Sequence, residues 1–267
     1  MKLNRILRSA AAVGTLALAS MSASAYQAFT VDESAVPGAV ANTFVADQIN
    51  GTYVETITAT IPGSFITSGV FEFSGFTFNN SPPAGGTQLE GVGAGGYSLY
   101  ALFEFSGSAG VNLAGDIVFN ANSGSAELWL DAGQDSSFTQ NATGAAFPTV
   151  TAGTADVLLG SVSSLQVGEG TGELGLANGN FEIVFDDFAL TVAGQSYFIK
   201  PTPFYMVLDI NGNFQDFSPV PVAGQEFTSE VTGAGQVFFK VPEPSAVALF
   251  ATGLLALGLA GRRRRRV

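Results

Sequence analysis

The side chains that could do chemistry in this chain of 267 residues are mostly carboxylates. The sequence holds 22 Asp and Glu residues against 10 Lys and Arg residues, and it has neither His nor Cys. Composition alone therefore excludes thiolate nucleophiles, imidazole bases, disulfides and zinc sites built from Cys or His. Two chemistries remain for the carboxylates: acid and base catalysis across a glycosidic bond, and the binding of hard cations such as Ca²⁺.

Catalysis by a carboxylate pair has little further support in the sequence. The stretch from Tyr26 to Lys240 contains no Arg, and its only Lys residues are Lys200 and Lys240. A serine triad would lack its base, and no arginine is present to clamp a developing oxyanion. We therefore expect that the protein is not an enzyme, with a carboxylate-based glycosidase as the least favoured alternative.

Oxygen ligands for a cation gather in two short segments. The segment DINGNFQD contributes Asp209, Asn211, Asn213 and Asp216, and the segment DAGQD contributes Asp131 and Asp135. Neither follows the EF-hand pattern, because Gly212 stands at the fourth position of its segment instead of the sixth. A hairpin turn and a polar loop are the simpler interpretations. We therefore expect weak binding of Ca²⁺ or Mg²⁺ and no tightly held cofactor.

The acidic residues are concentrated in the body of the chain, from Tyr26 to Lys240. This body has 21 carboxylates and two lysines, which give it a net charge of −19. Such a charge repels phosphates and anionic lipid headgroups, so nucleic acid is excluded as a partner. Divalent cations are the favoured partners of the body, because they relieve the repulsion between its carboxylates.

Aromatic composition bears on sugar binding. The chain has 23 Phe, 6 Tyr and 1 Trp, and Phe mostly fills cores while Trp and Tyr more often present rings to water and sugars. Trp129 alternates onto one strand face with Glu127 and Asp131, where it could stack on a sugar. A core position for Trp129 is the preferred interpretation. A carbohydrate-binding module with an exposed Trp129, or with an exposed Tyr97 and Tyr100, stays open as an alternative.

The elements that must position these side chains are strands. Period-two alternation recurs in short runs such as YSLYALFEFSG and SAELWLD, broken by Gly, Asn, Ser and Pro, with no amphipathic helix of useful length. This pattern predicts an all-β domain at residues 26–240, built as an antiparallel two-sheet β-sandwich of jelly-roll type. We further expect a bulge near Gly75, a hairpin turn at Asn211 and Gly212, and a mobile loop at residues 79–96.

The first 25 residues have the three parts of a secretory signal peptide. Lys2, Arg5 and Arg8 precede an apolar run, and Ala23-Ser24-Ala25 forms a small-x-small cleavage site. Cleavage after Ala25 leaves Tyr26 as the first residue of an exported protein.

The C-terminal segment at residues 241–267 has three parts of its own. Val241-Pro242-Glu243-Pro244 precedes an uncharged stretch from Ser245 to Gly261, and Arg262, Arg263, Arg264, Arg265 and Arg266 follow it. The stretch is about long enough to cross a bilayer as a helix, and the arginines would hold it at the cytoplasmic side. The two prolines keep the backbone extended at the outer edge of the membrane, within reach of a protease.

This combination resembles the PEP-CTERM sorting signal of Gram-negative bacteria. The resemblance rests on the motif Pro242-Glu243-Pro244-Ser245, the apolar span and the arginine cluster, together with the N-terminal signal peptide. It implies that an exosortase-type protease processes the precursor, which is held transiently in the inner membrane. The product is then released to the cell surface or the extracellular matrix.

A second resemblance lies in the body. The stretches YQAFTVDESAVPG and GTQLEGVGAGGYSLYALFEFSGSAG are similar to flocculation-associated PEP-CTERM proteins. That resemblance implies a structural protein of the extracellular polymeric substance, which promotes cell aggregation or biofilm together with exopolysaccharide.

Overall fold

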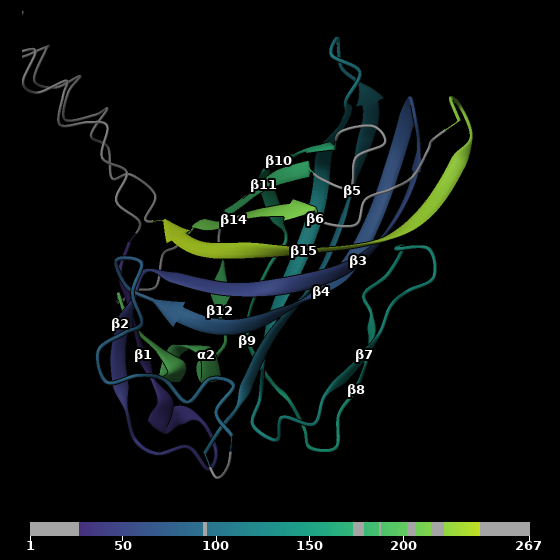
Figure 1. Ribbon diagram of the computed structural model, residues 1–267. Helices are drawn as coiled ribbons and strands as arrows, with labels where there is room; N and C mark the ends of the chain where they lie inside the picture. The colour runs from purple at the N-terminus through teal and green to yellow at the C-terminus, as the bar shows by residue number, and fades with distance from the viewer. Residues whose placement is uncertain are drawn as a thin grey trace, which may run out of the picture.

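The structure is a computed structural model that describes residues 27–92, 95–172, 179–186, 188–201, 207–214 and 222–240 (Figure 1). The predicted signal peptide with Ala23, Ala25 and Tyr26 lies outside the described residues. So does the C-terminal segment from Val241 onwards, with its predicted membrane helix.

One antiparallel sheet of ten strands forms the main part of the fold, in the order β10-β11-β14-β15-β3-β4-β5-β6-β9-β12. Its strands are β3 (Gln48–Thr60), β4 (Gly63–Thr77), β5 (Ser98–Val111), β6 (Ile117–Asp131), β9 (Val157–Val162), β10 (Ser164–Gly172), β11 (Gly179–Asp186), β12 (Ala189–Leu190), β14 (Val207–Phe214) and β15 (Glu226–Lys240). The beginning of β6 also pairs with β10, from Ile117 opposite Gly172 to Asn120 opposite Glu169. Eight of the strands therefore close into a ring, and β9 and β12 extend the sheet beyond β6.

The all-β class is confirmed, but the strand pairings correct the predicted two-sheet sandwich. The strands that would form two facing sheets belong to one sheet, which curls until its own inner face encloses the core (Figure 1). Alternation along a strand shows that one face is buried, and it cannot show whether that face packs on a second sheet or inside a curled one. The curvature comes with register shifts in long strands, as between Ser106 and Gly107 in β5.

The bulge predicted near Gly75 is confirmed. In the pairing of β3 with β4, Asn50 lies opposite Gly75 while Gly51 lies opposite Phe73, so Ser74 is the extra residue. The shift keeps Phe73 and Phe76 buried on the same side of the strand.

The hairpin turn predicted at Asn211 and Gly212 is wrong. Strand β14 runs straight through both residues, with Gly212 opposite Phe181 of β11 and opposite Gly235 of β15. An Asn-Gly pair favours a turn locally, but here two neighbouring strands hold the segment extended.

Smaller elements cover one side of the main sheet. Strands β1 (Phe29–Asp32), β2 (Thr43–Ala46) and β13 (Phe198–Lys200) form a three-stranded sheet in the order β13-β1-β2. The 3₁₀ turn η2 (Glu33–Ala35) and the helix α2 (Val192–Tyr197) lie next to it (Figure 1). A hairpin of β7 (Ser137–Thr139) and β8 (Thr149–Thr151) packs through Phe138 and Val150 against the cluster that contains Tyr100 of β5.

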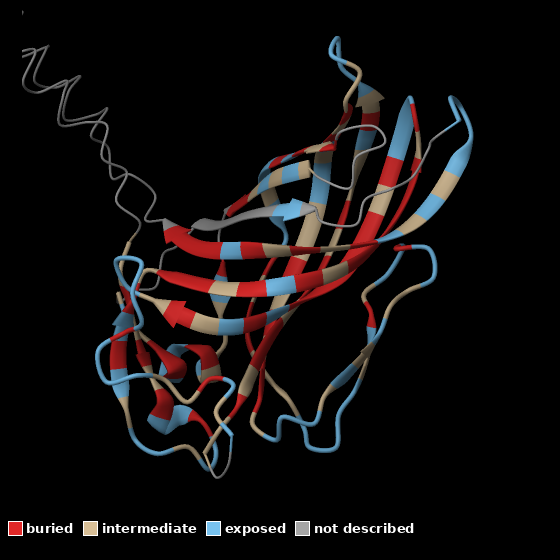
Figure 2. Cartoon of the chain, viewed as in Figure 1, coloured by how far each residue is buried: buried red, intermediate tan, exposed pale blue. Residues whose placement is uncertain are grey.

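Burial follows the curl of the sheet (Figure 2). The inner face of the ring is lined with Phe, Tyr and aliphatic side chains that are almost fully buried, for example Tyr53, Phe71, Leu99, Phe105 and Val237. The alternation in YSLYALFEFSG predicted this face of β5 correctly. The Phe-rich composition is therefore explained by one core that the ring encloses.

Candidate functional site

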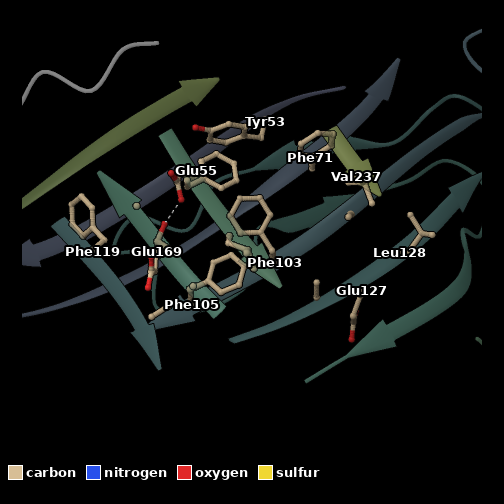
Figure 3. A pocket seen from close by; sticks show the side chains of 18 of the residues that line it. Tyr53, Glu55, Phe71, Phe103, Phe105, Phe119, Glu127, Leu128, Glu169 and Val237 are labelled. Atoms are coloured by element: carbon tan, nitrogen blue, oxygen red, sulfur yellow. Dashed lines mark hydrogen bonds between the residues drawn. The ribbon is translucent and has the colours of Figure 1, made fainter. Parts of the chain in front are cut away.

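The interior of the ring contains a cavity of about 90 Å³ (Figure 3). Its wall is nearly all apolar and comes from strands on every side of the ring. Aromatic rings supply most of the wall: Tyr53, Phe65, Phe71, Phe73, Phe103, Phe105, Phe119, Phe181, Phe188 and Phe239. Small residues such as Ala101, Ala126 and Gly170 leave the space that these rings surround.

Glu55 is the carboxylate that the fold buries in this wall. It occupies an inward position of β3, two residues from Tyr53 and two from Ile57, and it is 6% exposed. Gly69 lies opposite Glu55 on β4. A Cβ at Gly69 would lie 2.5 Å from Cζ of Phe103 and 2.8 Å from Cβ of Glu55, so only glycine leaves room for both side chains.

A single side chain bonds the Glu55 carboxyl. The hydroxyl of Thr67 lies 2.7 Å from Oε2 of Glu55 and 3.0 Å from the carbonyl oxygen of Thr56. Burial raises the pKa of Glu55 to about 7, although the hydrogen bond from Thr67 opposes the shift. When Glu55 is protonated, its O–H can donate to Thr67 while the Thr67 hydroxyl donates to Thr56, and all three groups are satisfied. The same burial, with the nearby charge of Glu55, raises the pKa of Tyr53.

Glu33 is a second buried carboxylate, and it is fully buried outside the ring in η2. Five hydrogen bonds of 2.7 to 3.0 Å reach its two oxygens: from Asn42 Nδ2, Thr87 Oγ1, Gln88 N, Gln88 Nε2 and the Tyr97 hydroxyl. Burial alone would raise the pKa of Glu33, but the hydrogen bonds from Gln88, Asn42 and Thr87 outweigh it and hold the pKa below its ordinary value.

The Glu33 cluster, defined as Glu33 with Asn42, Thr87, Gln88 and Tyr97, fixes the loop that was predicted to be mobile. Gln88 also accepts from the backbone N–H of Val40 and donates to the Val40 carbonyl oxygen. The hydroxyls of Tyr97 and Tyr197 lie 2.6 Å apart, which joins the cluster to α2. The described part of residues 79–96 is therefore tied to the N-terminal strands and to the helix.

The predicted cation ligands Asp131 and Asp135 accept hydrogen bonds from backbone N–H groups. Asp131 is buried, and its oxygens accept from the backbone N–H groups of Gly133, Asp135 and Ser136 at 2.8 to 2.9 Å. Oδ1 of Asp135 accepts from the backbone N–H groups of Gly153 and Thr154 at 3.1 and 3.2 Å. These bonds hold together the two segments that flank the β7–β8 hairpin, residues 131–136 and 153–154.

The other predicted ligands are not gathered in a turn. Asp209, Asn211 and Asn213 lie at alternate positions of β14, and Asp216 lies outside the described residues. The side-chain oxygen Oδ1 of Asn213 accepts from the backbone N–H of Ala234. Within the described residues, no group of three or more acidic side chains is placed to hold a metal ion.

Trp129 lies on the outer face of the sheet, half-buried beside the β7–β8 hairpin. Its ring stacks on Tyr100 with centroids 6.4 Å apart and 7° between the planes, and its Nε1 donates to Glu127 at 3.1 Å. Tyr100 and Tyr97 are 3% and 0% exposed, so the alternative of an exposed Tyr97 and Tyr100 platform is wrong. In the stretch that follows β6, Phe138, Phe147 and Val150 pack against the cluster that contains Tyr100.

Sequence reasoning missed both buried carboxylates, for different reasons. The alternation of Tyr53, Glu55 and Ile57 places Glu55 on the apolar face of its strand, so that signal was available in the sequence. The donors to Glu33 come from segments up to 64 residues away in sequence, and no local pattern marks such a cluster.

The predicted sorting residues lie where the described body stops. Strand β15 ends at Lys240, and Val241, Pro242, Glu243, Pro244 and Ser245 follow outside the described residues. No helix in the described part of the chain has the length and apolar character needed to cross a membrane.

Comparison with known proteins gives one match. Residues 240–266 match the PEP-CTERM protein-sorting motif, which covers the Pro-Glu-Pro sequence, the apolar stretch and the arginine cluster. No curated protein and no solved structure gives a match. The chain thus carries at residues 240–266 a PEP-CTERM sorting motif, which implies an exported protein that an exosortase processes at the membrane.

Proposed function

We propose that the protein is a structural component of the cell surface and extracellular matrix, which promotes flocculation or biofilm formation together with exopolysaccharide. The sorting motif at residues 240–266 supports delivery to the surface through exosortase. The body then acts as a compact acidic unit, and divalent cations link its carboxylates to those of the polysaccharide.

The observation that carries this proposal is the meeting of the two ends of the described body. The backbone N–H of Gln27 donates to the carbonyl oxygen of Phe239 at 3.1 Å, and the rings of Phe29 and Phe239 lie 5.0 Å apart. One residue, Tyr26, separates Gln27 from the predicted signal peptide, and Lys240 is the first residue of the sorting match. The two described ends that adjoin the predicted signal peptide and the sorting motif therefore lie side by side.

This arrangement suits a protein that is presented at the membrane with one end of its fold facing the membrane. While both segments are in the membrane, the adjoining ends of β1 and β15 face the membrane and the rest of the ring faces away from it. Cleavage on either side does not disturb the ring, because β15 is paired with β3 from Glu226 to Phe238 and with β14 up to Lys240. Processing thus releases or attaches a unit that is already folded.

Complementation of a deletion strain tests the proposal. We expect cells lacking the gene to settle more slowly as flocs, and the wild-type chain to restore settling in the presence of millimolar Ca²⁺. A chain with Pro242→Ala and Pro244→Ala should not restore it, whereas Pro82→Ala, at an exposed proline of the body, should behave as wild type. Unchanged flocculation in the deletion strain would contradict the proposal.

A further inference from the structure

The interior cavity combines one buried carboxyl with an apolar wall. Its lining in the described chain includes no basic residue, and Glu55 is the acidic residue whose side chain lies on the inner face of the ring. Glu127 and Glu169 belong to the lining from outward positions of β6 and β10: Glu127 accepts from Trp129 on the outer face, and Glu169 is exposed between the buried Gly168 and Gly170. A molecule in the cavity therefore meets aromatic rings on most sides and the single carboxyl of Glu55.

The Glu55 carboxyl has bonding capacity that the protein does not use. Thr67 bonds Oε2, and Oε1 has no hydrogen-bond partner among the described residues. Burying the charge of a carboxylate is costly, and a donor that reaches Oε1 from the cavity would offset that cost. The rings of Tyr53, Phe103 and Phe105 line the same space as the carboxyl (Figure 3), and aromatic faces attract cations.

We propose that this cavity binds a small lipophilic amine, whose ammonium group donates to Oε1 of Glu55 while its apolar body packs against the surrounding rings. A water molecule needs about 10–15 Å³ of such space, so a cavity of about 90 Å³ holds about six to nine non-hydrogen atoms. Phenylethylamine has this size. The net charge of the body raises the local concentration of cations and disfavours anions of similar shape.

The charge state of Glu55 gives the site a pH dependence. The titratable group near it is Tyr53 on the same strand, while the side chains of Glu127 and Glu169 lie on the outer face of the ring. Protonation of Glu55 removes the negative partner of the ammonium group. Because the pKa of Glu55 is about 7, an amine should bind about thirtyfold more weakly at pH 5.5 than at pH 8.

Titration calorimetry of the full chain in lipid nanodiscs tests the inference, with phenylethylamine and the neutral 2-phenylethanol as matched probes. At pH 8 we expect phenylethylamine to bind at least tenfold more tightly than 2-phenylethanol. Glu55→Gln should remove that preference and its pH dependence, while leaving 2-phenylethanol unaffected. Glu230→Gln, at an exposed carboxylate on β15, should change neither.

A second variant tests the location of the site. A Cβ at Gly170 meets nothing closer than 3.7 Å, and its nearest neighbours include Phe119 and Phe181 of the cavity wall. A side chain at this position can therefore start without a clash at its Cβ, and Gly170→Ile should extend into the cavity and weaken both probes at least tenfold. Equal binding of the two probes in wild type, amine binding that survives Glu55→Gln, or no binding of either probe would each overturn the inference. Because no outcome depends on sorting or flocculation, the result is independent of the proposed function.

Discussion

Replacing Glu33 by alanine should lower the free energy of unfolding by about 3–5 kcal/mol, the usual cost of removing one partner from a buried charged network. The substitution leaves four side chains and one backbone N–H group without their acceptor: those of Asn42, Thr87, Gln88 and Tyr97. Each donor stays buried or partly buried, and an unsatisfied buried donor is costly. Urea unfolding of the processed protein, followed by far-UV circular dichroism, measures the loss.

Glu33→Gln and Glu230→Gln complete this experiment. Glu33→Gln keeps the shape but places an NH₂ group among donors, so we expect it to lose at least half as much stability as Glu33→Ala. Glu230→Gln changes the charge equally at an exposed position and should stay within about 0.5 kcal/mol of wild type. If Glu33→Ala unfolds at the same urea concentration as Glu230→Gln, the Glu33 cluster does not hold the loop in place.

Replacing Glu55 by glutamine should raise the free energy of unfolding, in contrast to the Glu33 variants. This gain in stability should grow with pH. The folded pKa of about 7 lies above the ordinary value of 4.5, so between these pH values the folded protein binds more protons than the unfolded chain. Wild-type stability therefore falls as the pH rises through this window. The difference between Glu55→Gln and wild type should shift by about 2.5 kcal/mol in favour of the variant between pH 5 and pH 8.

Unfolding curves at pH 5, 6, 7 and 8 provide the measurement for Glu55. The Glu33 carboxyl acts in the other direction, because its folded pKa is lowered. Its contribution is present above about pH 4.5 and is lost as the pH falls through its folded pKa. A Glu55→Gln variant whose stability runs parallel to wild type from pH 5 to pH 8 would mean that Glu55 is ionised in the folded ring, contrary to its burial.

The sequence predicts the strands and their buried faces better than the way the strands join. Alternation placed Leu99, Phe103 and Phe105 on one face of β5, and the same side chains line the ring. The switch in phase at Gly75 predicted the bulge in β4. Closure depends on the pairing of β6 with β10, which are separated by about 50 residues, and nothing in either strand specifies that contact.

The candidate sites show the same difference between what a local pattern predicts and what the fold decides. The sorting motif is contiguous, so its spacing alone is enough to recognise it, and residues 240–266 match. The two acidic segments were predicted to bind cations because their side chains carry oxygen ligands. The fold instead uses Asp131 and Asp135 to bond backbone N–H groups, and it extends Asp209 and Asn211 along a strand. Side-chain type shows what a residue can bind, while the fold decides which groups reach it.

The central claim is that the working protein is the acidic ring, cut free of both membrane segments. The intact mass of the protein recovered from the cell surface or the medium tests this claim most directly. We predict a polypeptide that begins at Tyr26 and ends between Val241 and Ser245, with any further mass due to attached groups. A mass that includes the arginines from Arg262 to Arg266, or the residues before Tyr26, would contradict the account.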